Sequence, residues 1–108
     1  MNLVELVRYF REGGNYQDFC ELQFLDINSE VVEIYMRAPF ELENELVFFE
    51  IEKTDGNLDF EFKGLMFSNL FDFYFFLDVI EESNNNENRK LSNVDIAKNL
   101  FNYAINDA

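Results

Sequence analysis

Residues 46–66 read LVFFEIEKTDGNLDFEFKGLM and contain the strongest hairpin signal in the chain. Asp55-Gly56 separates two runs of alternating apolar residues, and this dipeptide favours the tight turn that joins antiparallel strands. We therefore predict two strands, Leu46–Lys53 and Leu58–Met66, joined by this turn. A two-residue turn fixes the predicted register. The expected pairs are Phe49 with Phe62 and Ile51 with Phe60 on an apolar side, and Glu50 with Glu61 and Glu52 with Asp59 on an acidic side.

The residues before this hairpin predict two more strands. Phe19–Leu25 alternates loosely in polarity and Val31–Arg37 alternates clearly, as half-buried strands do. Pro39 ends the second of these strands, because proline cannot donate a hydrogen bond to a neighbouring strand. Cys20 is expected to be a buried residue of the first strand, since free cysteine is among the most buried residue types.

Three helices are predicted at the two ends of the chain. Asn2–Glu12 carries apolar residues at helical spacing and ends at two glycines. Ser68–Glu82 is ambiguous, because its aromatic content favours a strand whereas its length, its apolar spacing and Ser68 as a cap favour a helix. We predict the helix. The last helix begins after Ser92, with Asp95 as the partner of that cap.

The chain of 108 residues is expected to form a single α+β domain over residues 1–108, with a polar linker at residues 83–90 before the last helix. Short connections favour a two-layer architecture, in which helices cover the apolar face of a four-stranded antiparallel meander sheet. These helices are the N-terminal one and the two C-terminal ones. The predicted core consists of Leu6, Phe10, Leu22, Phe24, Ile34, Met36, Phe49, Ile51, Phe60, Phe62, Phe73, Leu77, Leu100 and Phe101.

The composition excludes several classes of function. Eight Lys and Arg against 22 Asp and Glu give a net charge of −14, which argues against binding to nucleic acids or anionic membranes. One cysteine and no histidine exclude an internal disulfide, zinc sites built on cysteine or histidine, and histidine-dependent catalysis. The sequence shows neither an apolar run of about 18 residues nor the pattern of a signal peptide, so we expect a cytoplasmic protein.

More than half of the 22 acidic residues lie between Glu12 and Glu61, where the basic residues are Arg37 and Lys53. In the predicted meander, these carboxylates form one open face of the sheet. Like charges on opposite strands cost up to about 1 kcal/mol per pair, so such a face indicates adaptation to a cationic partner. The alternative is that the acidity only keeps the protein in solution. The candidate partner-binding residues are Glu33, Tyr35, Glu41, Glu43, Glu45, Glu50, Glu52, Asp59 and Glu61.

Two other uses of the carboxylates are weaker. Residues 55–59 faintly resemble part of a calcium loop, but Ile51 and Lys53 would then stand at liganding positions that they cannot fill. Paired carboxylates can serve as acid and base, but an open sheet face lacks the apolar pocket that raises the pKa of one of them. We therefore predict no catalytic residue, cofactor or metal, and a protein that is not an enzyme.

The expected function is that of an acidic inhibitor that binds a basic protein. The size and acidity are similar to those of immunity proteins of bacterial toxin systems, so an immunity protein or antitoxin against a nuclease-type toxin is favoured. A nuclease site is cationic because it holds phosphates, and carboxylates can occupy it in their place. The alternatives are a DNA mimic that blocks a DNA-binding or restriction protein, and a small acidic secretion chaperone. The oligomeric state is left open.

Overall fold

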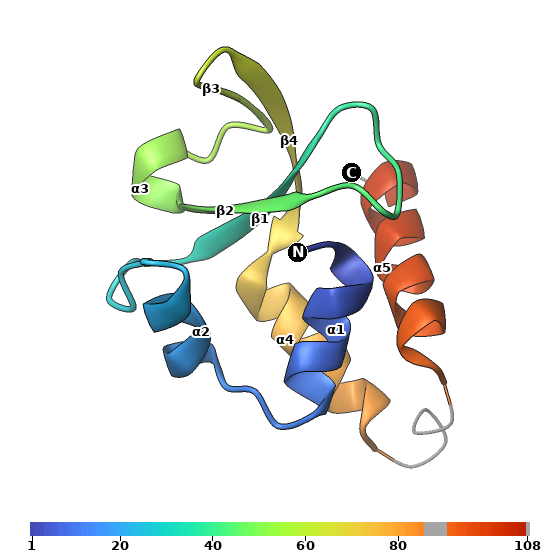
Figure 1. Ribbon diagram of the computed structural model, residues 1–108. Coiled ribbons are helices and arrows are strands. Elements are labelled where there is room, and N and C mark those ends of the chain that lie inside the picture. Colours follow the sequence, from blue (N-terminus) through green and yellow to red (C-terminus); the bar gives the residue numbers. More distant parts are fainter. Residues whose placement is uncertain (86–90, 108) are drawn as a thin grey trace.

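The computed structural model describes residues 1–85 and 91–107 (Figure 1). In these residues the elements are α1 (Leu3–Arg11), α2 (Tyr16–Leu22), β1 (Val32–Arg37), β2 (Leu46–Glu50), α3 (Ile51–Thr54), β3 (Asp59–Phe62), β4 (Leu65–Asp72), α4 (Phe73–Ser83) and α5 (Asn93–Asp107). The strands form one antiparallel sheet. This confirms the predicted α+β class, a sheet of four antiparallel strands, an N-terminal helix and C-terminal helices, although the strands are not the four predicted segments. The predicted linker falls largely on residues 86–90, outside the described residues.

The strands do not lie in the order in which they follow each other along the chain. Their order is β2-β1-β4-β3, so β1 lies between β2 and β4, and β2 is an edge strand. Val32 lies opposite Glu50 in β2, and Glu33 lies opposite Asp72 in β4. The expected pairing of the third strand with the fourth is therefore wrong.

The turn chemistry explains this difference. Asp55 and Gly56 have φ angles of 54° and 72°, but they end the short helix α3 instead of forming a hairpin. The hairpin turn is Lys63-Gly64, where φ is also positive, and it places Asp59 opposite Ser68. Asp-Gly is suited both to a tight hairpin and to a left-handed helix end, because both require positive φ.

Two segments have a different secondary structure from the one predicted. Phe19–Leu25 is not a strand, because Asn15 caps α2 by accepting a hydrogen bond from the Asp18 amide at 2.8 Å. Ser68–Glu82 is divided: its first five residues belong to β4, and α4 begins at Phe73 after the cap residue Asp72. The last helix begins as predicted, since Ser92 and Asp95 exchange side chain–backbone hydrogen bonds.

The main core lies between the helices and one face of the sheet. Figure 1 shows α1, α4 and α5 packed together on that side, and these helices contact one another. The ring of Phe10 lies within 6 Å of the rings of Phe19, Phe73 and Phe76. Most of the predicted core is buried or partly buried, but Leu22, Phe24 and Phe62 are exposed, by 65%, 93% and 40%.

The sheet curls, and a second apolar cluster fills its concave face. Tyr35, Phe49 and Phe67 are buried there, with Val47 and Phe60 packed against them. The ring of Phe49 in β2 lies 5.0 Å from that of Phe60 in β3, although these two strands are the opposite edges of the sheet. Both faces of the sheet therefore bury apolar side chains, and the curl brings β3 over β2.

The start of α4 can be tested through its cap. The Asp72 carboxylate accepts a hydrogen bond from the Phe75 amide at 2.8 Å. Replacement of Asp72 by Ala should lower the free energy of unfolding by about 1 kcal/mol, because an amide at the start of the helix loses its partner. Chemical denaturation measures this, with Asp78→Ala on the exposed side of α4 as the control. Equal stability of the two variants would contradict the assigned start of the helix.

Candidate functional site

The candidate site is a groove of about 360 Å³ along the free edge of β2. Three parts of the chain line it: the segment that follows α2, β2 together with α3, and β3. We refer to it as the groove, defined by Gln23, Phe24, Leu25, Leu46, Val47, Phe48, Phe49, Glu50, Lys53, Phe60 and Phe62. Most of these residues are apolar, as is usual for binding sites.

One wall of the groove is formed by Phe24 and Leu25. Phe24 has a left-handed backbone with φ of 57° and is 93% exposed. Its amide donates to the Glu21 carbonyl, and the Leu25 amide donates to the Cys20 carbonyl at 2.8 Å. These bonds close the end of α2 and hold the aromatic ring out beside β2.

The other wall is formed by β3. Phe60 and Phe62 both pack against Phe49 of β2, with ring centroids 5.0 and 5.3 Å from that of Phe49. Aromatic contacts of this kind contribute more stabilising free energy than the burial of their apolar area alone. Because the sheet curls, β3 lies against β2 and forms a wall beside its edge, and this produces the groove.

Glu33 and Tyr35 lie on the concave face but are buried, contrary to the expected open acidic face. The Glu33 carboxylate accepts hydrogen bonds from the Thr54 hydroxyl at 3.0 Å and from the side-chain amide of Asn69 at 2.7 Å. The Tyr35 hydroxyl donates to the Asn57 carbonyl at 2.5 Å. These polar groups fasten α3 and the turn after it to the sheet. Glu33 and Tyr35 alternate with apolar residues along β1 because they face this buried network, and not because they face solvent.

Glu50, at the end of β2, is also buried, and its hydrogen bonds join segments that line the groove. Its carboxylate accepts hydrogen bonds from the Lys53 ammonium at 2.9 Å and from the Asp26 amide at 2.8 Å. The bond from Lys53 is the main reason that the pKa of Glu50 is lowered, against the opposing effect of burial. Glu50 therefore ties the loop after Phe24 to the end of β2.

The remaining candidate residues are exposed but are distributed over several loops and strands. Glu52 accepts hydrogen bonds from the Ser29 hydroxyl and the Glu30 amide, which lower its pKa. Asp59 accepts a hydrogen bond from Ser68, and Glu45 pairs with the N-terminal ammonium. Glu41 and Glu43 lie in the β1–β2 loop, and Glu61 lies on β3.

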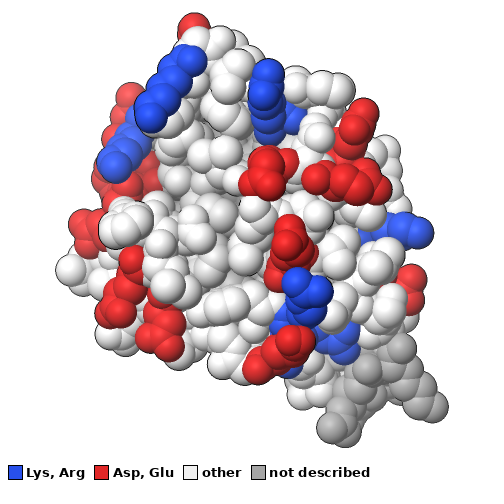
Figure 2. All heavy atoms as spheres, viewed as in Figure 1, with Lys and Arg blue, Asp and Glu red and all other residues white. Residues whose placement is uncertain are grey.

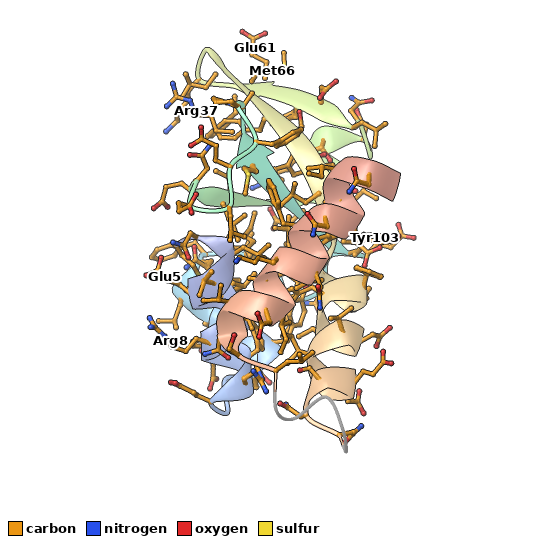
Figure 3. The ribbon with its side chains drawn as sticks, turned by 90° about the vertical axis from the view of Figure 1, so that its right-hand side faces the viewer. Glu5, Arg8, Arg37, Glu61, Met66 and Tyr103 are labelled. Carbon is orange, nitrogen blue, oxygen red and sulfur yellow. The ribbon has the colours of Figure 1, made fainter. Side chains whose placement is uncertain are left out.

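The acidic side chains consequently do not form one continuous row. On the face drawn in Figure 2, they lie in separate groups with uncharged surface between them. Figure 3 places Glu61 and Met66 at the end of the sheet that lies away from the helices. Sequence analysis missed the groove itself, because it assigned Phe24 and Phe62 to the core. The signal that was available for this segment is the Asn15 cap, which predicts a helix that begins at Tyr16 instead of a strand over Phe19–Leu25.

Comparison with protein-family models, curated proteins and solved structures gives no match. Among the described residues, no helix combines the length and the apolar character needed to cross a bilayer. Residues 1–85 and 91–107 also contain no group of three acidic or cysteine side chains placed to hold a metal ion. The function is therefore inferred from the groove and from the distribution of charge around it.

The structural role of Glu33 is testable by an isosteric change. Glu33→Gln should lower the free energy of unfolding by about 1–3 kcal/mol, because an amide nitrogen cannot accept the bond that one carboxylate oxygen now accepts. Urea denaturation of this variant and of the exposed control Glu41→Gln measures the difference. If the two variants were equally stable, Glu33 would not fasten α3 to the sheet.

The lowered pKa of Glu50 gives a pH dependence with a defined sign. A carboxylate whose pKa is lower in the folded state stabilises the fold above its unfolded value, here 4.5, and this stabilisation disappears as the pH falls through the folded pKa. The stability difference between the unmodified chain and Glu50→Gln should therefore be largest near neutral pH and shrink below about pH 4.5. Unfolding curves across this range measure it, with Glu43→Gln at an exposed loop position as the matched control. A difference that grew on acidification would contradict the assignment.

Proposed function

We propose that the protein is a non-enzymatic inhibitor that binds and neutralises a basic protein in the cytoplasm. An immunity protein or antitoxin directed against a nuclease-type toxin is the favoured form. The observation that carries the proposal is an apolar groove, with exposed carboxylates close to its lining along the sequence, on a chain of net charge −14. The groove offers surface that a partner can bury, and the charge selects a cationic partner.

The charge around the groove is predominantly negative. Exposed acidic residues lie within two positions of its lining in each of the three segments, and we refer to five of them as the rim carboxylates: Glu21, Asp26, Glu45, Asp59 and Glu61. The basic residues in the same segments are Lys53 and Lys63, and Lys53 is engaged by Glu50. A partner that approaches the groove therefore meets a net negative field.

This arrangement suits the inhibition of a nuclease. An enzyme that holds phosphates needs a cationic surface, and exposed carboxylates can pair with the same lysine and arginine side chains. Opposite fields also raise association rates toward about 10⁸–10⁹ M⁻¹s⁻¹ at low salt, which helps an antidote reach a toxin quickly. Glu41, Glu43 and Glu52 add to this long-range field, because they are exposed as well.

A small acidic secretion chaperone is the second candidate, and the exposed apolar groove is the observation that favours it. Such a protein would bind an unfolded client segment and would be expected to form a homodimer. A DNA mimic has less support, since it needs carboxylates at regular intervals, and on the face drawn in Figure 2 they lie in separate groups. The solution mass of the protein alone and the folded state of its partner separate these functions.

The proposal is tested by affinity capture at low salt from an extract of the organism that makes this chain. The expected result is one basic protein at one-to-one stoichiometry that salt releases and whose nuclease activity the chain inhibits. Recovery of an unfolded segment by a dimer would indicate the chaperone, and recovery of several DNA-binding proteins would indicate the mimic. Recovery of no basic partner would contradict the proposed inhibition.

Charge reversal at the rim should slow association with the captured partner. The variant Glu21→Lys with Glu61→Lys is expected to reduce the association rate at least several-fold at low salt and to weaken its salt dependence, with little effect on dissociation. Stopped-flow mixing measures both rates. Glu81→Lys with Glu82→Lys is the matched control, because it changes the net charge equally on α4, which contributes no residue to the groove. Equal slowing by the two variants would show that only total charge matters.

A further inference from the structure

We propose that the groove receives an extended, basic segment of the partner, which adds to the sheet as a further strand beside β2. This inference rests on the proposed function and specifies how the partner is recognised. Addition of a strand to a free sheet edge is a general mode of peptide recognition, in which backbone hydrogen bonds supply affinity and flanking pockets supply specificity. Three features of the groove support it.

The first feature is the direction of the backbone groups of β2. In an antiparallel pair, successive residues point their N–H and C=O groups alternately toward and away from the neighbouring strand. The Ile51 amide donates to Val31 beside β1, whereas the Leu46 amide donates outward to the carbonyl of Met1. By this alternation Phe48, which lines the groove, points its backbone N–H and C=O away from β1 and into the groove. An added strand would pair there.

The second feature is that apolar walls stand on both sides of this edge. Alternate side chains of a strand project to opposite faces, so an added strand would direct one set toward Phe60 and Phe62 and the other toward Phe24 and Leu25. The groove has about 360 Å³ for these side chains. Phe24 is 93% exposed in the free chain, so a bound apolar side chain would cover a ring that now faces water.

The third feature is the charge, which decides among the possible occupants. The rim carboxylates favour lysine or arginine in an entering segment, while the lining favours apolar residues where the segment lies in the groove. A second copy of this chain would bring another charge of −14 and another set of rim carboxylates to the same edge. The occupant that fits is therefore a basic segment with a short apolar centre.

The test uses a blocked synthetic peptide in which two lysines precede and two follow the sequence Val-Phe-Val. Titration into the full chain at low salt, followed by NMR, should show saturable binding and slower hydrogen exchange at the Phe48 amide. An analogue with glutamate in place of lysine should bind at least about tenfold more weakly, because the rim carboxylates repel it. Two further analogues carry N-methyl groups, one on the central phenylalanine and the other on both valines. Only one edge of the peptide can face β2, so one of these two analogues should lose binding and the other should keep it.

A matched pair of variants locates the binding. Phe24→Asn removes the exposed ring with a residue that tolerates positive φ, and it should weaken peptide binding by about tenfold. Leu58→Asn is the control, because Leu58 is 71% exposed and lies outside the groove lining. Circular dichroism of both variants confirms that the fold is retained.

The inference is overturned if the peptide does not bind, if both N-methyl analogues bind as well as their parent, or if exchange at the Phe48 amide is unchanged. Dimerisation of the free chain through β2 would overturn it in favour of a second copy as the occupant. These results differ from failure of the proposed function. A basic partner captured in a salt-dependent complex, together with a peptide that does not bind, would remove only strand addition. Peptide binding without any basic partner would remove the inhibitor and leave the groove as a peptide site.

Discussion

The buried carboxylate of Glu33 is the interaction on which the shape of this molecule depends. It stands on the concave face of the central strand β1 and accepts hydrogen bonds from Thr54 at the end of α3 and from Asn69 in β4. A buried charge is costly unless it is hydrogen-bonded. Here the two donors come from α3 and β4, so the Glu33 carboxylate joins β1 to both elements. With α3 fixed in this position, the chain returns along β3 over the edge of β2, and the groove forms between β3 and the segment after α2.

The two faces of the curled sheet bury different sets of apolar side chains. The convex face packs on α1, α4 and α5 and supplies the main core, whereas the concave face buries a smaller aromatic cluster around Tyr35, Phe49 and Phe67. Because apolar side chains are buried on both faces, the edge of β2 is a place where backbone groups of the sheet can meet a partner. In the function that we propose, the exposed carboxylates act through their long-range field instead of as a contact surface in themselves. This explains how a strongly acidic chain can combine electrostatic selection with an apolar binding site.

The first helix, the last helix and the strand β1 could be predicted from sequence because their signals are local. The apolar spacing of α1, the Ser92–Asp95 cap of α5 and the alternation of Val31–Arg37 each correspond to a structural element at nearly the same residues. The pairing of strands could not be predicted in the same way, because Asp55-Gly56 and Lys63-Gly64 both permit positive φ and only the tertiary fold selects between them. Glu33 and Glu50 alternate as solvent-facing residues would, yet hydrogen bonds from residues distant in sequence allow them to be buried. The groove was missed for the same reason, since its walls come from segments that meet only through the curl.

The account is tested most directly by hydrogen exchange across the whole chain, free and in complex with the basic partner that we propose. Binding in the groove predicts slower exchange at Phe24–Asp26, along β2 and in β3, with little change in α4 and α5. Protection confined to α4 and α5, with β2 and β3 unaffected, would contradict the groove as the binding site. It would also show that the carboxylates around the groove serve a purpose other than recognition of this partner.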